Sequence, residues 1–110
     1  MKTQPIPPEL TLEARRAALA KAALMRKERA VIREQLGKRE TTVADLLKQM
    51  DNDSIGKMRV LSIVEALPGL GKVRSRRLMR ELGISEKRRL RGLSKGQTER
   101  LLNAVTKKAA

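Results

Sequence analysis

Residues 67–74 read Leu-Pro-Gly-Leu-Gly-Lys-Val-Arg, which places two glycines around one apolar residue directly before a helical run. Pro68 ends the preceding helix, because proline lacks an N–H group and clashes with the turn before it. Gly69 and Gly71 accept backbone angles that other residues avoid. The stretch therefore predicts a tight turn at a helix N-terminus. We expect four backbone N–H groups to point outward there, those of Leu70, Gly71, Lys72 and Val73.

Such a helix end suits a phosphate, because its unpaired donors and its partial positive charge favour an anion. Residues 72–91 hold nine Lys/Arg and two Glu, a net charge of +7. A purely structural turn does not need this density of like charge, which costs stability through repulsion. We therefore interpret the turn and the basic residues near it as a phosphate-binding surface. Its candidate members outside the turn are Lys57, Arg74, Arg88, Arg89, Arg91 and Ser94.

The composition of the 110-residue chain points to a polyanionic partner and excludes several kinds of chemistry. The net charge is +14, and there is no Cys, His, Phe, Trp or Tyr. Disulfides, thiolate metal sites, the usual general base and aromatic stacking platforms are therefore absent. No paired carboxylates or Walker motif occur, so we expect no enzyme, no metal and no cofactor. No apolar run approaches the roughly 18 residues of a membrane span, and the first residues do not resemble a signal peptide, so we expect a cytoplasmic protein.

The pattern predicts an all-α protein in three parts. Residues 1–9 hold three prolines and form a flexible tail, and residues 10–37 form a long basic helix that is capped by Thr11. Residues 38–110 form a small helical domain. The early turns of the long helix are rich in Ala and should project as a basic arm, which is either solvated or in contact with DNA. The later turns should dock on the domain through Leu24, Val31, Ile32 and Leu36.

Local signals divide the domain into helices. An apolar stripe predicts a helix from Thr42 to Met50, and the polar residues 51–54 predict a turn. A helix over 60–67 should bury Leu61, Val64 and Leu67. A helix over 72–82 should bury Ser75, Leu78, Met79 and Leu82 and expose its arginines, and Gly83 should end it. Ser94 and Gln97 form a capping box before the last helix.

Together these motifs resemble a known module. The turn at 67–74, Met-Arg-Glu-Leu-Gly-Ile at 79–84 and Arg-Arg-Leu-Arg-Gly-Leu at 88–93 are similar to the helix–two-turns–helix module of a small-subunit ribosomal protein and of bifunctional DNA glycosylases. The whole order, with Arg-Arg-Ala-Ala at 15–18 and Ile-Gly-Lys-Met at 55–58, resembles the actinobacterial integration host factors. The resemblance covers nearly the full length.

This resemblance implies a nucleoid-associated protein that binds double-stranded DNA with little sequence preference, bends or compacts it and assists site-specific recombination. Carried over from the family, the DNA-binding residues are Gly69, Leu70, Gly71, Lys72, Arg88, Arg89 and Arg91; Lys57, Arg74 and Ser94 follow from their position and chemistry. A phage integrase is a further partner to consider, and we expect a monomer. Two alternatives stay open: a protein that binds structured RNA, and a helical protein on a membrane surface, although the basic helix lacks the Trp or Phe of interfacial helices.

Overall fold

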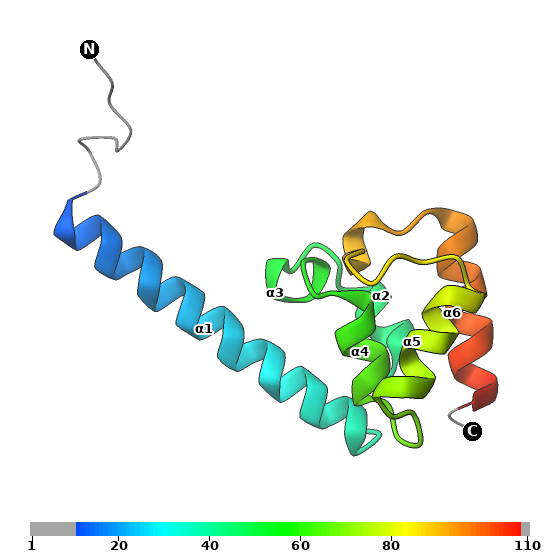
Figure 1. Cartoon of the computed structure of the whole chain (residues 1–110). Coiled ribbons are helices and arrows are strands. Elements are labelled where there is room, and N and C mark those ends of the chain that lie inside the picture. Colours follow the sequence, from blue (N-terminus) through cyan, green and yellow to red (C-terminus); the bar gives the residue numbers. More distant parts are fainter. Residues whose placement is uncertain (1–10, 109–110) are drawn as a thin grey trace, which may run out of the picture.

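The computed structural model describes residues 11–108, which form an all-α protein (Figure 1). In this part of the chain there are six α-helices and one 3-10 helix, and no named β-strand. A long first helix projects from a domain that the other elements build. The elements are α1 (Leu12–Gly37), α2 (Val43–Leu47), α3 (Asp53–Gly56), α4 (Val60–Ala66), α5 (Lys72–Glu81), η1 (Leu90–Gly92) and α6 (Lys95–Lys108). The flexible tail predicted for residues 1–9 lies outside the described residues.

Both ends of α1 follow from local chemistry. The Thr11 side chain accepts a hydrogen bond from the backbone N–H of Ala14 at 3.0 Å, as expected of an N-cap. Gly37 is the last helical residue, but the left-handed conformation that follows belongs to Arg39, whose φ is +62°. The helix therefore ends where the sequence predicts, with an arginine rather than a glycine in the left-handed position.

The docking face of α1 is narrower than predicted. Leu36 is buried and Ile32 packs against the core, whereas Leu24 and Val31 are 56% and 46% exposed. Leu24 and Val31 are seven residues apart and so lie along one side of the helix, whereas Ile32 and Leu36 follow another side. Only that second side meets the domain, so the expectation that Leu24 and Val31 dock is wrong.

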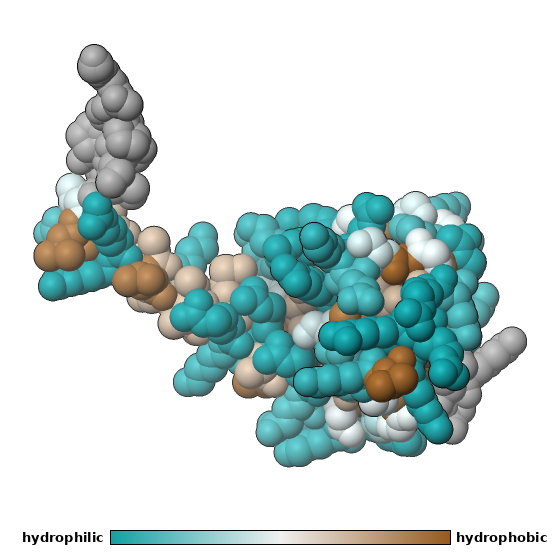
Figure 2. Space-filling model, in the orientation of Figure 1, coloured by the Kyte–Doolittle hydropathy of each residue, from teal (hydrophilic) through white to brown (hydrophobic). Residues whose placement is uncertain are grey.

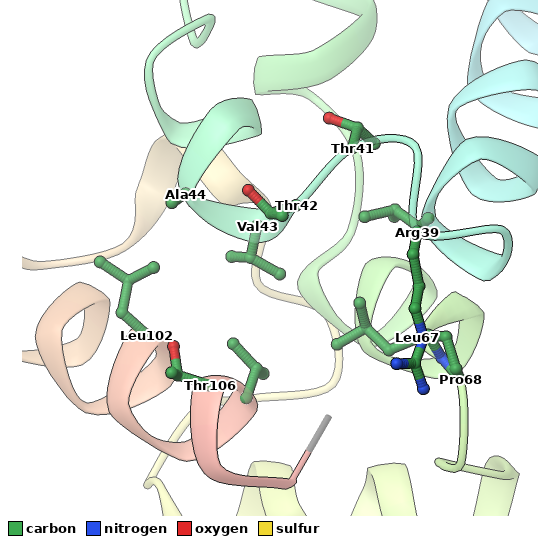
Figure 3. Close-up of a pocket in the computed structure, with 11 residues that line it drawn as sticks. Arg39, Thr41, Thr42, Val43, Ala44, Leu67, Pro68, Leu102 and Thr106 are labelled. Carbon is green, nitrogen blue, oxygen red and sulfur yellow. The ribbon is translucent and has the colours of Figure 1, made fainter. Parts of the chain in front are cut away.

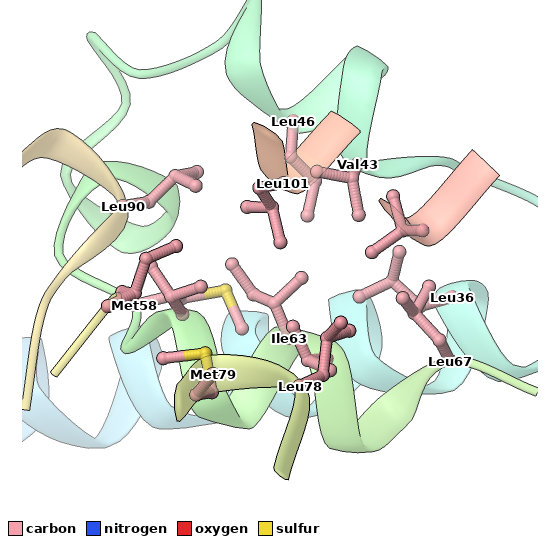
Figure 4. Packing of buried hydrophobic residues seen from close by; sticks show 14 of the residues in the cluster. Leu36, Val43, Leu46, Met58, Ile63, Leu67, Leu78, Met79, Leu90 and Leu101 are labelled. Atoms are coloured by element: carbon pink, nitrogen blue, oxygen red, sulfur yellow. The ribbon is translucent and has the colours of Figure 1, made fainter. Parts of the chain in front are cut away.

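The core lies where α2, α4, α5 and α6 converge with the end of α1 (Figure 4). It consists of Leu, Ile, Val and Met, as the composition requires. Its centre is formed by side chains without any exposed surface: Val60, Ile63, Val64, Met79, Leu90 and Leu101. Helix α5 contributes Met79 to this centre and η1 contributes Leu90. The basic residues of α5 and of η1 are therefore both held on the core.

The region around residues 47–56 differs from its prediction. Helix α2 has the predicted cap, because the Thr42 side chain accepts from the Asp45 N–H at 3.1 Å, but it ends at Leu47. Residues 53 and 54 were expected in a turn and instead begin α3. There the Asn52 side chain caps the helix at 2.9 Å from the Ser54 N–H, and Ile55 is buried. A short helix with one apolar residue leaves no periodic pattern to recognise.

The remaining helices follow their predictions with two corrections, of which one is Leu82: it follows the end of α5 and is half-buried, not buried. In α4, Leu61 is only half-buried, while Val60 and Ile63 are fully buried. This helix is covered by α1 and α5 on two sides, so its buried surface is broader than one stripe. Helix α5 buries Ser75, Leu78 and Met79 and exposes all four of its arginines, and Gly83 follows it with a φ of +70°. The capping box of α6 also forms, with bonds of 3.0 and 3.1 Å between Ser94 and Gln97.

Candidate nucleic-acid interface

The glycine turn leads α4 into α5 as predicted, but one of the four expected donors is already occupied. Gly69 has a φ of +82°, which favours glycine, and Gly71 is the extended N-cap of α5. The N–H of Leu70 does not point outward, because it donates to the Leu67 carbonyl at 3.3 Å and closes the turn. The Leu70 side chain is only 7% exposed, so this residue anchors the turn on the core.

The donors that remain are those of the first turn of α5. The first backbone bond at this helix end runs from the Ser75 N–H to the Gly71 carbonyl at 2.9 Å, and no side chain within residues 11–108 caps it. The N–H groups of residues 71–74 therefore have no partner within the helix. Lys72 and Arg74 are exposed beside them. One helix end thus combines four backbone donors, the positive end of a dipole and two cationic side chains.

The arginine segment is held in place by backbone pairing. The N–H of Val60 donates to the Arg88 carbonyl at 2.9 Å, and the N–H of Leu90 donates to the Met58 carbonyl at 2.8 Å. These two bonds form an isolated antiparallel bridge between Arg59 and Arg89. Because Leu90 is fully buried beside it, the bridge fixes the backbone from which Arg88 and Arg89 project into solvent.

Each arginine of this segment has its own surroundings. The Arg89 guanidinium donates to the Lys57 carbonyl at 2.7 Å, and the Arg88 guanidinium donates to the Gly92 carbonyl at 3.3 Å. Arg91 points back to the protein: it donates to the Met50 carbonyl at 2.6 and 3.2 Å and to an Asp53 carboxylate oxygen at 3.1 Å. The Ser94 side chain serves as the N-cap of α6.

A basic groove opens where α1 passes the domain. It has a volume of about 310 Å³ and is lined by Arg29 and Arg33 of α1, by Lys57, Arg59 and Arg89, and by Met58 and Ser62. Sequence reasoning did not single out Arg29 and Arg33 as site residues. Their spacing of four residues puts both on one side of α1, but only the packing of α1 against α4 shows which side faces the domain.

The turn and the arginine segment are not one cluster. Arg59 precedes α4 and pairs with Arg89, while Pro68 follows the other end of α4. Seven helical residues rise by about 10 Å, so at least that distance separates the two surfaces along the helix axis. In Figure 1 the turn between α4 and α5 lies at the bottom of the domain, and the segment that leads into η1 lies at its top.

We call the glycine turn with the N-terminus of α5 the first surface, and the arginine segment with the basic groove the second surface. Asp53 is an acidic residue beside the second surface. Its carboxylate accepts from Arg91 and lies 3.8 Å from the Lys57 ammonium group. The hydrogen bond from Arg91, followed by the charge of Lys57, holds the pKa of Asp53 below its ordinary value of 3.8. The carboxylate is therefore ionised at neutral pH and is engaged by two of the predicted site residues.

The rest of the surface offers fewer features. Figure 2 shows a largely hydrophilic face with isolated hydrophobic patches. The apolar pocket of about 360 Å³ in Figure 3 lies between the end of α1, α2, Leu67–Pro68 and α6, away from the arginine segment. Among the described residues, no group of three acidic, His or Cys side chains gathers as a metal site. No helix in this part of the chain is long and apolar enough to cross a membrane.

Comparison with known proteins agrees with this architecture. Residues 36–105 match the family model described as the S13-like H2TH domain. The chain is 50% identical over 91 residues to the integration host factor of Streptomyces coelicolor, which covers 82% of this chain and 85% of the relative. It is 45% identical over 96 residues to the integration host factor of Mycobacterium tuberculosis, which covers 86% of this chain and 91% of the relative.

A solved structure is also similar. The structure of sIHF bound to an 8-bp palindromic DNA has a TM-score of 0.75 and 44% sequence identity, and it covers 77% of this chain and 97% of that chain. The glycine turn at residues 67–74 and the arginine segment at residues 88–93 both lie inside the matched domain. Because it carries an S13-like H2TH domain and is 44–50% identical to relatives over 82–86% of its length, the chain belongs to the actinobacterial integration host factor family.

Proposed function

We propose that the chain binds double-stranded DNA along its phosphate backbone and acts as a nucleoid-associated architectural protein, not as an enzyme. The observation that carries this proposal is the DNA in the structure of sIHF, a relative of the same fold at 44% identity. The chemistry of the present chain supports it, because a helix end with unpaired donors and a set of arginines on a fixed backbone are both complementary to phosphates.

Phosphate contacts position a protein on DNA and carry no sequence information, so we propose binding with little sequence preference. The proposed contacts are Gly71, Lys72 and Arg74 at the first surface, and Lys57, Arg88 and Arg89 at the second. The roles of Gly69 and Leu70 are to shape the turn, and that of Ser94 is to cap α6. Arg29 and Arg33 join the second surface through the groove.

The wider biological role follows from the family. We propose that the chain, as a monomer in the cytoplasmic nucleoid, bends or compacts DNA and assists site-specific recombination with a partner such as a phage integrase. Residues 10–37 would then be a basic arm, and residues 38–110 the DNA-binding domain. Two surfaces about 10 Å or more apart along α4 support bending, because DNA that follows both is drawn around the domain.

The test is duplex DNA binding by the wild type and by the double variant Arg88→Ala/Arg89→Ala at several salt concentrations. If five phosphates are neutralised, log K falls against log[salt] with a slope of about −4.5. Removing two contacts should weaken binding and make the slope shallower by about 1.8. The matched control is Lys48→Ala/Arg100→Ala, which also removes two positive charges, from exposed positions outside both surfaces.

Two outcomes would count against the proposal, and a third would count against the arginine contacts. A wild type whose affinity does not change with salt would contradict phosphate binding. If unlabelled structured RNA displaces bound duplex DNA more effectively than unlabelled duplex DNA does, the RNA-binding alternative is favoured. Equal losses in the control and in the arginine variant would mean that net charge, not the arginine segment, determines affinity.

A further inference from the structure

Arg91 differs from the two arginines before it, because its guanidinium group is turned toward the protein. It makes three hydrogen bonds, two to the Met50 carbonyl and one to the Asp53 carboxylate, at distances of 2.6 to 3.2 Å. Arg88 and Arg89 each make one such bond. A guanidinium whose donors are occupied by the protein has fewer donors left for a phosphate.

The space that Arg91 occupies is shaped for it. A Cβ atom on Gly56 would lie 2.7 Å from two guanidinium nitrogens of Arg91 and 2.5 Å from the Met50 carbonyl oxygen. Gly56 has an ordinary backbone conformation, since its φ is not positive. The glycine at this position is therefore explained by the space that the Arg91 guanidinium needs over α3, and not by an unusual backbone angle.

These contacts join segments that are far apart in the sequence. Arg91 lies in η1, 41 residues after Met50 and 38 residues after Asp53. Asp53 also lies 3.8 Å from the Lys57 ammonium group, and the Lys57 carbonyl in turn accepts from Arg89. The chain of contacts thus runs from Arg91 through Asp53 and Lys57 to Arg89, which lines the basic groove.

We propose that Arg91 and Asp53 are positioning residues, which fix η1 on α3 and thereby orient Lys57 and Arg89 toward a phosphate. This inference rests on the proposed function. Its consequence is that an acidic residue supports the binding of a polyanion. By charge alone, an acid beside the site repels DNA, and its removal strengthens binding. If the acid holds the site together, its removal weakens binding. The sign of the effect separates the two.

The experiment compares Asp53→Ala with Asp51→Ala in duplex DNA binding at one salt concentration. Both variants remove one negative charge from an exposed position in the same segment, but only Asp53 bonds Arg91. We expect Asp51→Ala to bind as tightly as the wild type or slightly more tightly. Asp53→Ala should bind about fivefold more weakly, the cost of losing one charge-assisted hydrogen bond. Far-UV circular dichroism ensures that both variants are compared in the folded state.

Two further variants separate positioning from a general loss of structure. Asp53→Glu keeps a carboxylate near Arg91 and should recover part of the lost affinity. Arg91→Lys keeps the positive charge but cannot replace the forked contact with Met50 and Asp53, so it should lose affinity as Asp53→Ala does. Arg91→Lys with wild-type affinity would mean that Arg91 acts through its charge, and would overturn the proposal.

The result for Asp53 is also decisive by itself. If Asp53→Ala binds as tightly as Asp51→Ala, the positioning role is wrong, although the proposed DNA binding stands. If the wild type does not bind duplex DNA at all, the proposed function fails first. The two failures are therefore distinguishable in a single set of titrations.

Discussion

Two serines are buried in the domain, and their hydroxyl groups have different partners. Ser54 donates a 2.5 Å hydrogen bond to a carboxylate oxygen of Glu28 and so ties α3 to α1. Ser75, on the buried side of α5, has no hydrogen-bond partner among the described residues. A buried hydroxyl without a partner carries the cost of desolvation without a compensating bond. The two positions therefore make opposite contributions to stability.

We expect Ser75→Ala to raise the free energy of unfolding by about 1 kcal/mol, because it removes an unpaired polar group and introduces a better helix former. Ser54→Ala should lower it by about 1 to 2 kcal/mol, because it leaves Glu28 without its partner. Urea unfolding of the two variants measures both effects. A loss of stability in Ser75→Ala would mean that the hydroxyl makes a bond in solution, which would contradict this explanation.

The same contrast shows what single residues reveal in the sequence. The spacing of Ser75 with Leu78 and Met79 predicts its burial correctly, because helix periodicity is a local property. Its lack of a partner is not local, and neither is the bond between Ser54 and Glu28, which are 26 residues apart. The predicted outward N–H of Leu70 is wrong for a related reason: the turn closes on Leu67, whose carbonyl the motif alone does not place.

Among the helices, the N-terminal caps were more predictable than the buried faces. The caps at Thr11, Thr42 and Ser94 form as expected, since a cap and its acceptor lie within a few residues. The buried faces of α1 and α4 depend on which neighbours cover them. The predicted burial of Val31 and Leu61 was therefore wrong. The candidate site is divided in the same way: the glycine turn is local, but the bridge between Arg59 and Arg89 joins residues 30 positions apart. The assignment of these residues to DNA stays a prediction.

Helix α3 should respond to pH through Asp53. Arg91 lowers the pKa of this carboxyl below its ordinary value of 3.8 in the folded chain. Its contribution to stability is therefore fully present above the unfolded pKa and is lost as the pH falls through the lower, folded pKa. We expect the wild type to lose stability as the pH falls below about 4, and Asp53→Asn to lack that part of the dependence. Urea unfolding as a function of pH measures this, and parallel curves would contradict it.

The net charge of the chain has opposite effects on folding and on binding. Lys and Arg together number 26 against 12 Asp and Glu, and the core consists of aliphatic side chains and methionine without any aromatic residue. Repulsion among like charges destabilises the folded state, whereas the same charges favour a polyanion. DNA that binds only the folded chain adds stability by linkage. The free protein and its DNA complex should therefore respond differently to salt.

We expect a rise from about 50 to 300 mM NaCl to raise the melting temperature of the free chain, because salt screens its self-repulsion. With duplex DNA present, the same rise should lower the melting temperature, because affinity falls steeply with salt and the linkage term shrinks with it. Thermal unfolding of both samples across the salt range measures the two slopes. Slopes of the same sign would mean that charge repulsion does not limit the stability of the free fold, or that binding does not depend on phosphates. Arg88→Ala/Arg89→Ala separates these cases, because it should reduce the slope of the DNA sample while the free chain still gains stability with salt.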